Sequence, residues 1–230
     1  MSLKSELDSE VAGIFADQWA KRDGAKIPES EDLKLGNDAV RLDATVLYAD
    51  LSGSTAMVDL YPPAFCAEVY KAFLHCSAKL IRAEGGVITA YDGDRIMGVF
   101  IGARKNSAAA TCALKINGAV SGVVQPALKS QYPGNPFVIR HVVGVDTSPL
   151  FVARTGVRGA NDLVWVGAAA NYAAKLTECD ASYPSWITHR VFDVMNDQVK
   201  SSQGRAMWEA RSWTNMGGLT VYRSNWTWPV

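Results

Sequence analysis

The sequence predicts an α+β fold, in which helices pack on one face of a mostly antiparallel sheet. Two observations lead to this prediction. From residue 40 onward, apolar runs with strand and helix spacing follow one another as strand, helix, hairpin, helix and strand. In addition, 48% of the 230 residues are apolar, which is enough to fill one full core.

The first forty residues differ from the rest of the chain. Apolar residues recur at helical spacing from Ser5 to Lys21, which predicts a short amphipathic helix. The polar stretch RDGAKIPESEDLKLGND follows and has the composition of a linker. We therefore expect an N-terminal helix and linker over residues 1–40 and one larger domain over residues 41–230.

The expected elements of the larger domain follow from runs rich in β-branched and aromatic residues, and from Ala-rich runs with helical spacing. They are, in order, a strand at 39–50, a mostly helical stretch at 52–84, a hairpin at 85–102, a long helix at 106–128, two strands within 137–153, a strand at 162–167, a third helix at 168–180, and final strands at 185–191 and 218–224.

Charge and cysteine content restrict the function classes. Lys plus Arg and Asp plus Glu number 23 each, so the composition does not suggest a surface that binds nucleic acid. The four cysteines are scattered and form no CxxC pair, as expected for reduced thiols in a cytoplasmic protein. The N-terminus is too polar for a signal peptide, and no apolar stretch reaches the length of a membrane span. We expect a cytoplasmic protein that binds neither nucleic acid nor membranes.

Asp50 stands at the end of an apolar run, in VLYADLSGST, directly before small residues that open a helix. A carboxylate at this point can hold a hard cation, and it can equally cap the helix. The free N–H groups at a helix start can cradle phosphate oxygens. Here those groups belong to Leu51, Ser52, Gly53, Ser54 and Thr55.

Asp94 is a second isolated carboxylate, in the hairpin turn of YDGDRIMGVF. Asp and Gly are ordinary turn residues, so this motif alone indicates no more than a turn. However, strand pairing would bring the turn beside the end of the Asp50 strand. Two carboxylates next to a phosphate-binding helix start are what a Mg²⁺-dependent nucleotidyl reaction requires.

These two motifs, together with VGAAANYAAKLTE, resemble the class III nucleotide cyclase catalytic domain, and they occur in that family's order from about residue 41 to residue 224. The resemblance implies a ferredoxin-like βαββαβ core and a head-to-tail homodimer with each active site at the interface. It also implies two Mg²⁺ or Mn²⁺ ions per site, held by Asp50, Asp94 and the backbone of Leu51. The substrate would be a nucleoside triphosphate.

The same resemblance assigns roles on the third motif. Asn171 falls on the family's ribose-orienting asparagine, and Lys175 replaces the transition-state arginine one helical turn later. Lysine keeps the charge but loses the bidentate fork. An exposed helix face without a function is the competing interpretation of this pair. The family's late basic residue that grips the triphosphate falls at Met216. Arg211, Arg223 or Lys175 could take its place, and the sequence does not choose among them.

The base-reading positions depart from the family. Ala90 and Val164 stand where purine cyclases carry polar residues, so neither purine edge would find its usual hydrogen-bond partner. Tyr48 and Arg95 flank the two aspartates instead and would narrow the pocket while offering donors to carbonyl oxygens. Tyr48 could also be ordinary core, and Arg95 a solvated turn residue.

This combination resembles the pyrimidine cyclases of bacterial Pycsar anti-phage defence. The resemblance implies conversion of UTP, with CTP as the alternative, to a 3′,5′-cyclic nucleotide that acts on a downstream cyclic-nucleotide-binding effector. An adenylate or guanylate cyclase with atypical base contacts is one competing hypothesis. A catalytically inactive cyclase-like module for dimerisation or nucleotide binding is another.

Overall fold

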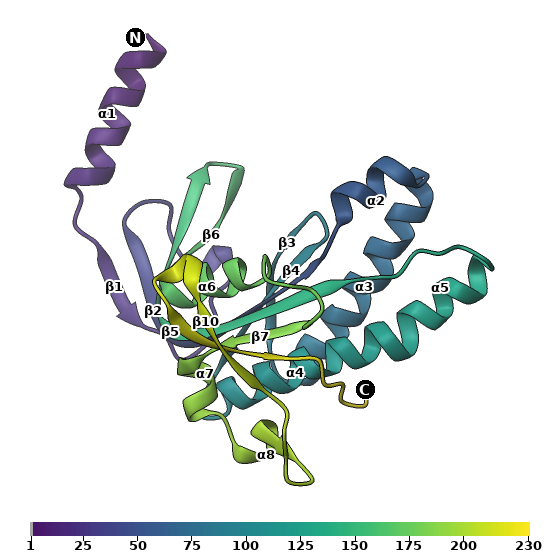
Figure 1. The fold of residues 1–230 in the computed structure, drawn as a ribbon. Coiled ribbons are helices and arrows are strands. Elements are labelled where there is room, and N and C mark those ends of the chain that lie inside the picture. Colours follow the sequence, from purple (N-terminus) through teal and green to yellow (C-terminus); the bar gives the residue numbers. More distant parts are fainter. Residues whose placement is uncertain (1) are drawn as a thin grey trace.

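The structure is a computed structural model that describes residues 2–230. Its main sheet has the strand order β10-β11-β7-β5-β2-β4-β3, with β1 pairing on β2 and β6 pairing on β5 (Figure 1). The strands are β1 (Ala20–Asp23), β2 (Asp38–Leu51), β3 (Val87–Asp92), β4 (Arg95–Ile101), β5 (His141–Val157), β6 (Ala160–Val166), β7 (Ser185–Thr188), β8 (Ser201–Ser202), β9 (Arg205–Ala206), β10 (Glu209–Trp213) and β11 (Leu219–Ser224).

The helices connect these strands and cover them. They are α1 (Leu3–Ala16), α2 (Ser54–Leu60), α3 (Pro63–Ala83), α4 (Lys105–Ala119), α5 (Gln125–Gln131), α6 (Ala168–Leu176), α7 (His189–Val194) and α8 (Asp197–Lys200). The chain runs β2, α3, β3, β4, α4, β5, and these four strands lie side by side as β5-β2-β4-β3. This arrangement is the predicted βαββαβ core, with every neighbouring pair inside it antiparallel.

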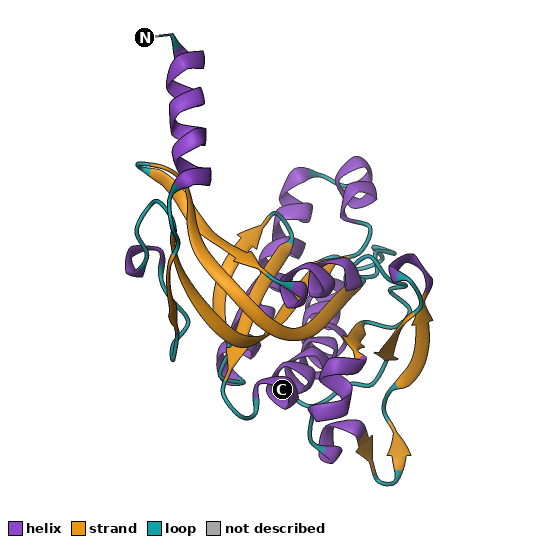
Figure 2. Cartoon of the chain, turned by 90° about the vertical axis from the view of Figure 1, so that its left-hand side faces the viewer, coloured by secondary structure: helices purple, strands orange, loops and turns teal. Residues whose placement is uncertain are grey.

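Strand β2 separates the two faces of the sheet, because successive side chains of a strand point to opposite sides. Leu47, Ala49 and Leu51 belong to the large core cluster beneath α3 and α4. Tyr48 and Asp50 lie on the other face and are only partly buried. That face is covered in part by α6, whose alanines pack on β2 and β5. The sheet is strongly coiled, as Figure 2 shows.

Close backbone packing holds α6 on this second face. A Cβ added at Gly144 of β5 would lie 2.2 Å from the carbonyl oxygen of Ala173. No side chain larger than hydrogen fits at that distance, so glycine at this position lets the helix rest directly on the strand. The long helices α3 and α4 therefore cover one face of the sheet as predicted, while the shorter α6 lies against the opposite face.

Most predicted elements are confirmed, and several boundaries were wrong. The stretch predicted as two strands within 137–153 forms one strand, β5, which pairs with β2 over thirteen residues. The long helix at 106–128 contains a π-helical turn at Val120–Val124 between α4 and α5. Residues 185–191 are half strand and half helix, because α7 begins at His189. The predicted helix at 5–21 ends at Ala16, and β1 includes its last two predicted residues and the first two of the predicted linker.

The continuous helix Lys105–Gln131 is long and apolar enough to be considered as a membrane span by composition alone. Its most apolar window is 61% buried inside the domain, where it packs on α3, β2 and β5. It is therefore accounted for as the core helix of the domain.

Candidate active site

Asp50 is the last residue but one of β2, and it faces Arg95 across the antiparallel ladder with β4. The Oδ2 atom of Asp50 accepts hydrogen bonds from Nε of Arg95 at 3.0 Å and from Nη2 at 2.6 Å. Both side chains are mostly buried, with 17% of the Asp50 side chain and 29% of the Arg95 side chain exposed. The sequence predicted Arg95 as a donor to the base. The structure shows two of its nitrogens engaged by Asp50, which leaves Nη1.

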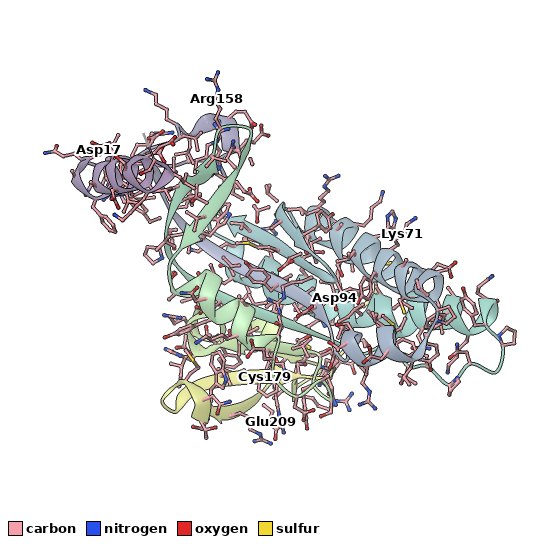
Figure 3. The ribbon with its side chains drawn as sticks, turned by 90° about the horizontal axis from the view of Figure 1, so that it is seen from above. Asp17, Lys71, Asp94, Arg158, Cys179 and Glu209 are labelled. Atoms are coloured by element: carbon pink, nitrogen blue, oxygen red, sulfur yellow. The ribbon has the colours of Figure 1, made fainter. Side chains whose placement is uncertain are left out.

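Asp94 occupies the two-residue turn between β3 and β4. Gly93 precedes it with φ of +59°, which is the conformation that the first central residue of a type II′ hairpin turn requires. The Oδ2 atom of Asp94 is buried and has no hydrogen-bond partner. A buried carboxylate oxygen without a partner is costly unless it ligates a cation. Figure 3 shows Asp94 near the middle of the molecule.

The charge of Asp94 acts on the ionisation of Asp50. Burial raises the pKa of the Asp50 carboxyl, the bonds from Arg95 oppose this increase, and the charge of Asp94 adds to it. Within residues 2–230 no third Asp, Glu, His or Cys joins them. A close pair of carboxylates, one with an unpartnered oxygen, is a donor set that suits a hard divalent cation and that repels itself without one. The residues present therefore fit the predicted metal site.

Tyr70 of α3 lies close enough to this site to feel its charges, and the sequence did not reveal it. Burial raises the pKa of its hydroxyl, and the charges of Asp94 and Asp50 raise it further, so the phenol lies within electrostatic reach of both carboxylates. Nothing in the spacing of α3 distinguishes Tyr70 from a core residue. Only its position opposite the hairpin turn shows its relation to the site.

The predicted phosphate cradle is smaller than expected. Gly53 is the N-cap of α2 with φ of +78°, and the helix contains only seven residues. The N–H of Ser52 donates to the carbonyl oxygen of Arg140 at 2.8 Å, so this group is not available to a phosphate. Leu51 is the last residue of β2 and pairs with His141. Ser54 and Thr55 keep first-turn N–H groups that have no intrahelical partner.

Tyr48 of β2 and Ala90 of β3 lie on either side of β4, close to the carboxylates. Tyr48 pairs with Met97 on one side and with Gly144 on the other, and Met97 in turn pairs with Ala90 of β3. Tyr48 is half-buried, and the guanidinium carbon of Arg95 lies 5.9 Å from its ring centre. The predicted alternation of Tyr48 with Asp50 on one face of the strand is confirmed.

Asn171 and Lys175 lie one turn apart on the exposed side of α6. Lys175 lines a cleft of about 390 Å³ with Arg211, Met216 and Arg223. All residues proposed for the triphosphate grip thus line one cleft. Both arginines are bound to Glu209, whereas Nζ of Lys175 contacts only Sδ of Met216, at 3.7 Å, among the residues that the structure describes.

Val164 lies far along the sheet from Asp50 of the same chain. Asp50 pairs with Val142 of β5, and Val164 of β6 pairs with Ala153 of β5. Eleven residues of strand separate these two rungs, which is roughly 35 Å of extended chain. Val164 is 38% exposed. One chain therefore does not bring all the predicted site residues together.

Comparisons with known proteins give a consistent result. No family model matches the chain. A Xanthomonas perforans protein named uridylate cyclase is 51% identical, and a Burkholderia cepacia protein of the same name is 48% identical, each over the full length of both chains. A third uridylate cyclase, from a Rhodovulum species, is 39% identical over 98% of this chain and 97% of its own.

Solved structures resemble the fold at low identity. The adenylyl cyclase CyaB from P. aeruginosa matches with a TM-score of 0.67 and 18% identity, over 81% of this chain and 95% of that one. The guanylyl cyclase Cya2 matches with a TM-score of 0.67 and 17% identity, over 82% and 94%. A guanylate cyclase domain from Catenaria anguillulae, solved in complex with GTP, matches with a TM-score of 0.63 and 14% identity, over 80% and 97%.

Proposed function

The chain belongs to the uridylate cyclase family of nucleotide cyclases, and from this membership we propose that it converts UTP to 3′,5′-cyclic UMP and pyrophosphate. The observation that carries the proposal is the pair Asp50 and Asp94, with the buried, unpartnered oxygen of Asp94. The relatives named uridylate cyclase, which cover the whole chain, support the choice of substrate.

The chemistry is an intramolecular phosphoryl transfer. The 3′-oxygen of the ribose attacks the α-phosphorus, the bond to the β-phosphate oxygen breaks, and the hydroxyl proton leaves. Asp50 and Asp94 would hold two divalent cations, Mg²⁺ or Mn²⁺, which when bound neutralise the triphosphate and acidify the 3′-hydroxyl. The protein otherwise contributes positioning and charge, since such reactions require little more from it.

Arg95 and Tyr48 are the proposed base readers. Arg95 places Nε and Nη2 on Asp50 and keeps Nη1, which bonds no residue in the described part of the chain. Uracil presents two carbonyl oxygens that a guanidinium or phenol donor can bond, whereas cytosine replaces one of them with an amino group. The methyl side chain of Ala90, on β3, offers a purine no hydrogen bond. These features favour UTP over CTP, and a pyrimidine over a purine.

The site is proposed to be completed by a second copy of the chain. Asn171 and Lys175 lie on an exposed helix face, and Val164 is roughly 35 Å of strand away from the rung of Asp50. In a head-to-tail homodimer these residues would lie over the partner's metal pair, where Asn171 orients the ribose and Lys175 binds the triphosphate. Lys175 forms no ion pair among the described residues, whereas Arg211 and Arg223 both pair with Glu209, and this difference supports its choice.

A biological role follows from the product. We propose a cytoplasmic second-messenger synthase in antiviral defence, whose cyclic nucleotide is bound by a separate effector. The resemblance to the pyrimidine cyclases of Pycsar defence supports this role. Phage challenge of cells carrying the wild type or the Asp50→Ala/Asp94→Ala variant, each with the neighbouring effector gene, tests it. Equal phage titres in both strains would contradict the role.

The test of activity is a product assay with four substrates. The protein is incubated with UTP, CTP, ATP or GTP, each with Mg²⁺ or Mn²⁺, and the products are identified by mass spectrometry. Cyclic UMP should dominate, and the folded Asp50→Ala/Asp94→Ala variant should make none. Dominant cyclic AMP or cyclic GMP would indicate a purine cyclase with atypical base contacts. No product from any triphosphate would indicate a binding module.

A further inference from the structure

Helix α1 is an amphipathic helix that its own chain leaves uncovered. None of its fourteen residues is buried, and it projects from the edge of the sheet (Figure 1). Its large apolar residues recur every three or four positions and so form one stripe along the helix. They are Leu3, Leu7, Val11, Ile14 and Phe15, which are 47–86% exposed. An isolated helix of this length is marginal in water, so the stripe requires a cover.

The base of α1 is nevertheless fixed to the catalytic sheet. The Nδ2 atom of Asn37 donates to the carbonyl oxygens of Ile14 and Asp17, at 2.9 and 2.7 Å. Trp19 packs edge-on against Phe151 of β5, with ring centres 4.9 Å apart. The helix is therefore held beside the sheet while its apolar stripe faces outward.

A matching surface lies at the other end of the sheet (Figure 1), where a groove of about 510 Å³ runs between α3 and the α5 segment. Its walls are mostly apolar, with side chains such as Val69, Ala72, Val124 and Leu128. The active-site residues described above do not line it. The volume is sufficient for two or three aliphatic or aromatic side chains.

Complementary charge rows flank these two surfaces, while Glu68, which also lines the groove, accepts a hydrogen bond from the hydroxyl of Tyr132. Glu6 and Glu10 stand one turn apart beside the apolar stripe of α1. Lys71, His75 and Lys79 form an exposed row along α3, and the first two line the groove. Among residues 2–230, neither glutamate and neither lysine of these rows forms an ion pair. Figure 3 shows Lys71 on the outer side of α3.

We propose that α1 of each chain docks into the α3–α5 groove of a second copy, with Leu7, Val11 and Phe15 in the groove and the glutamate row beside Lys71 and Lys79. Because α1 and the groove lie at opposite ends of the sheet, a head-to-tail pair brings each helix to the other chain's groove, and two-fold symmetry forms the contact twice. The inference rests on the proposed homodimer and adds a surface outside the active site.

Cross-linking tests the contact directly, because Cys76 already lines the groove. A Val11→Cys variant is treated with a short bis-maleimide, and the products are separated on a denaturing gel and mapped by mass spectrometry. We expect a covalent dimer that joins the new thiol to Cys76 of the other copy. The dimer should disappear in the Val11→Cys/Cys76→Ala variant.

Three results would overturn the proposal. The first is a bridge between two new thiols, which would pair α1 with a second α1. The second is a bridge to Cys76 within one chain, and the third is no bridge at all in a protein that is dimeric by ultracentrifugation. In each of these cases cyclase activity can persist, so the proposed function would stand. A monomeric protein without activity would instead reject the proposed dimer, and this inference with it.

The stripe and the charge rows can be tested separately by sedimentation. Leu7→Asp/Val11→Asp should raise the dimer dissociation constant at least tenfold. The matched control Ser5→Asp/Ser9→Asp adds the same charge to the opposite side of α1 and should change it less than threefold. Lys71→Glu/Lys79→Glu should also weaken the dimer, and Glu6→Lys/Glu10→Lys in the same chain should restore it. Equal effects of the stripe and control variants, or no restoration by the charge exchange, would overturn the proposed contact.

Discussion

The two faces of the central sheet differ in what they do, although the same strands form both. On the face under α3 and α4, β2 contributes Leu47, Ala49 and Leu51, which are at most 8% exposed. On the opposite face the earlier residues of the same strand are buried against α6, and only toward its end does it contribute Tyr48 and Asp50, which are polar and partly buried. Alternation at the end of β2 thus separates residues that stabilise the fold from residues proposed to perform the reaction.

The largest expected effect on activity comes from Asp50, on the sheet face that carries α6, and from Asp94. Asp50→Asn/Asp94→Asn should lower kcat by more than about 10⁴-fold, over about 5 kcal/mol of barrier, because the proposed metal ligands are lost. The midpoint of thermal unfolding should not fall. Asp43→Asn, on the same strand but with 71% of its side chain exposed, is the control and should retain full activity. A double variant that still cyclises UTP at a tenth of the wild-type rate would refute the assignment.

A change on the face under α3 and α4 should lower stability and leave activity unchanged. Phe73 is fully buried in the core cluster, and Phe73→Ala should lower the free energy of unfolding by about 3–5 kcal/mol. Activity per folded molecule should stay within twofold of the wild type, since no site residue moves. Urea unfolding and an assay at low temperature measure the two quantities. If the folded variant loses activity more than tenfold, the separation of the two faces fails.

His141 makes the covered face sensitive to acid. Burial lowers the pKa of this imidazole from 6.5 to about 4, so the folded state keeps it neutral where the unfolded state binds a proton. Stability from this residue is complete above pH 6.5 and is lost as the pH falls from 6.5 to 4, by about 3 kcal/mol. Between pH 7 and pH 4 the wild type should lose about 3 kcal/mol more unfolding free energy than His141→Phe does. Parallel curves would contradict it.

The smallest expected effect concerns the choice between UTP and ATP, which we assign to Arg95. Arg95→Lys keeps a positive charge beside Asp50 but loses the guanidinium fork, so the preference for UTP over ATP should fall by about tenfold. The ratio of the two kcat/KM values measures this, with Arg41→Lys of the same sheet as a control. A variant with the wild-type ratio would remove Arg95 from base reading and leave it as a partner of Asp50.

The sequence predicted the fold well, because it depends on alternation and helical spacing within single elements. The lengths of the helices and strands were harder to predict than their types. The stretch 137–153 was predicted as two strands, yet one strand, β5, continues through Pro149. The short elements β8–β10, α7 and α8 lack a periodic pattern long enough to detect.

Candidate site residues could be proposed from the sequence where they belong to recognisable motifs, as with Asp50 and Asp94, and their roles stay predictions. Others were missed where only tertiary contact defines them. Tyr70 resembles a core residue of α3, and the bond from the N–H of Ser52 to Arg140 involves two distant segments. The pairing of Arg95 with Asp50 likewise depends on strand register, which local spacing does not specify.

In the proposed homodimer, each active site takes its metal ligands from one chain and its α6 residues from the other. Mixing two inactive variants tests this claim: Asp50→Asn/Asp94→Asn supplies an intact α6, and Asn171→Ala/Lys175→Ala supplies intact carboxylates. Random exchange makes half of the dimers mixed, each with one complete site of two, so the mixture should regain about a quarter of wild-type activity with UTP. A mixture that exchanges subunits and stays inactive would contradict the account.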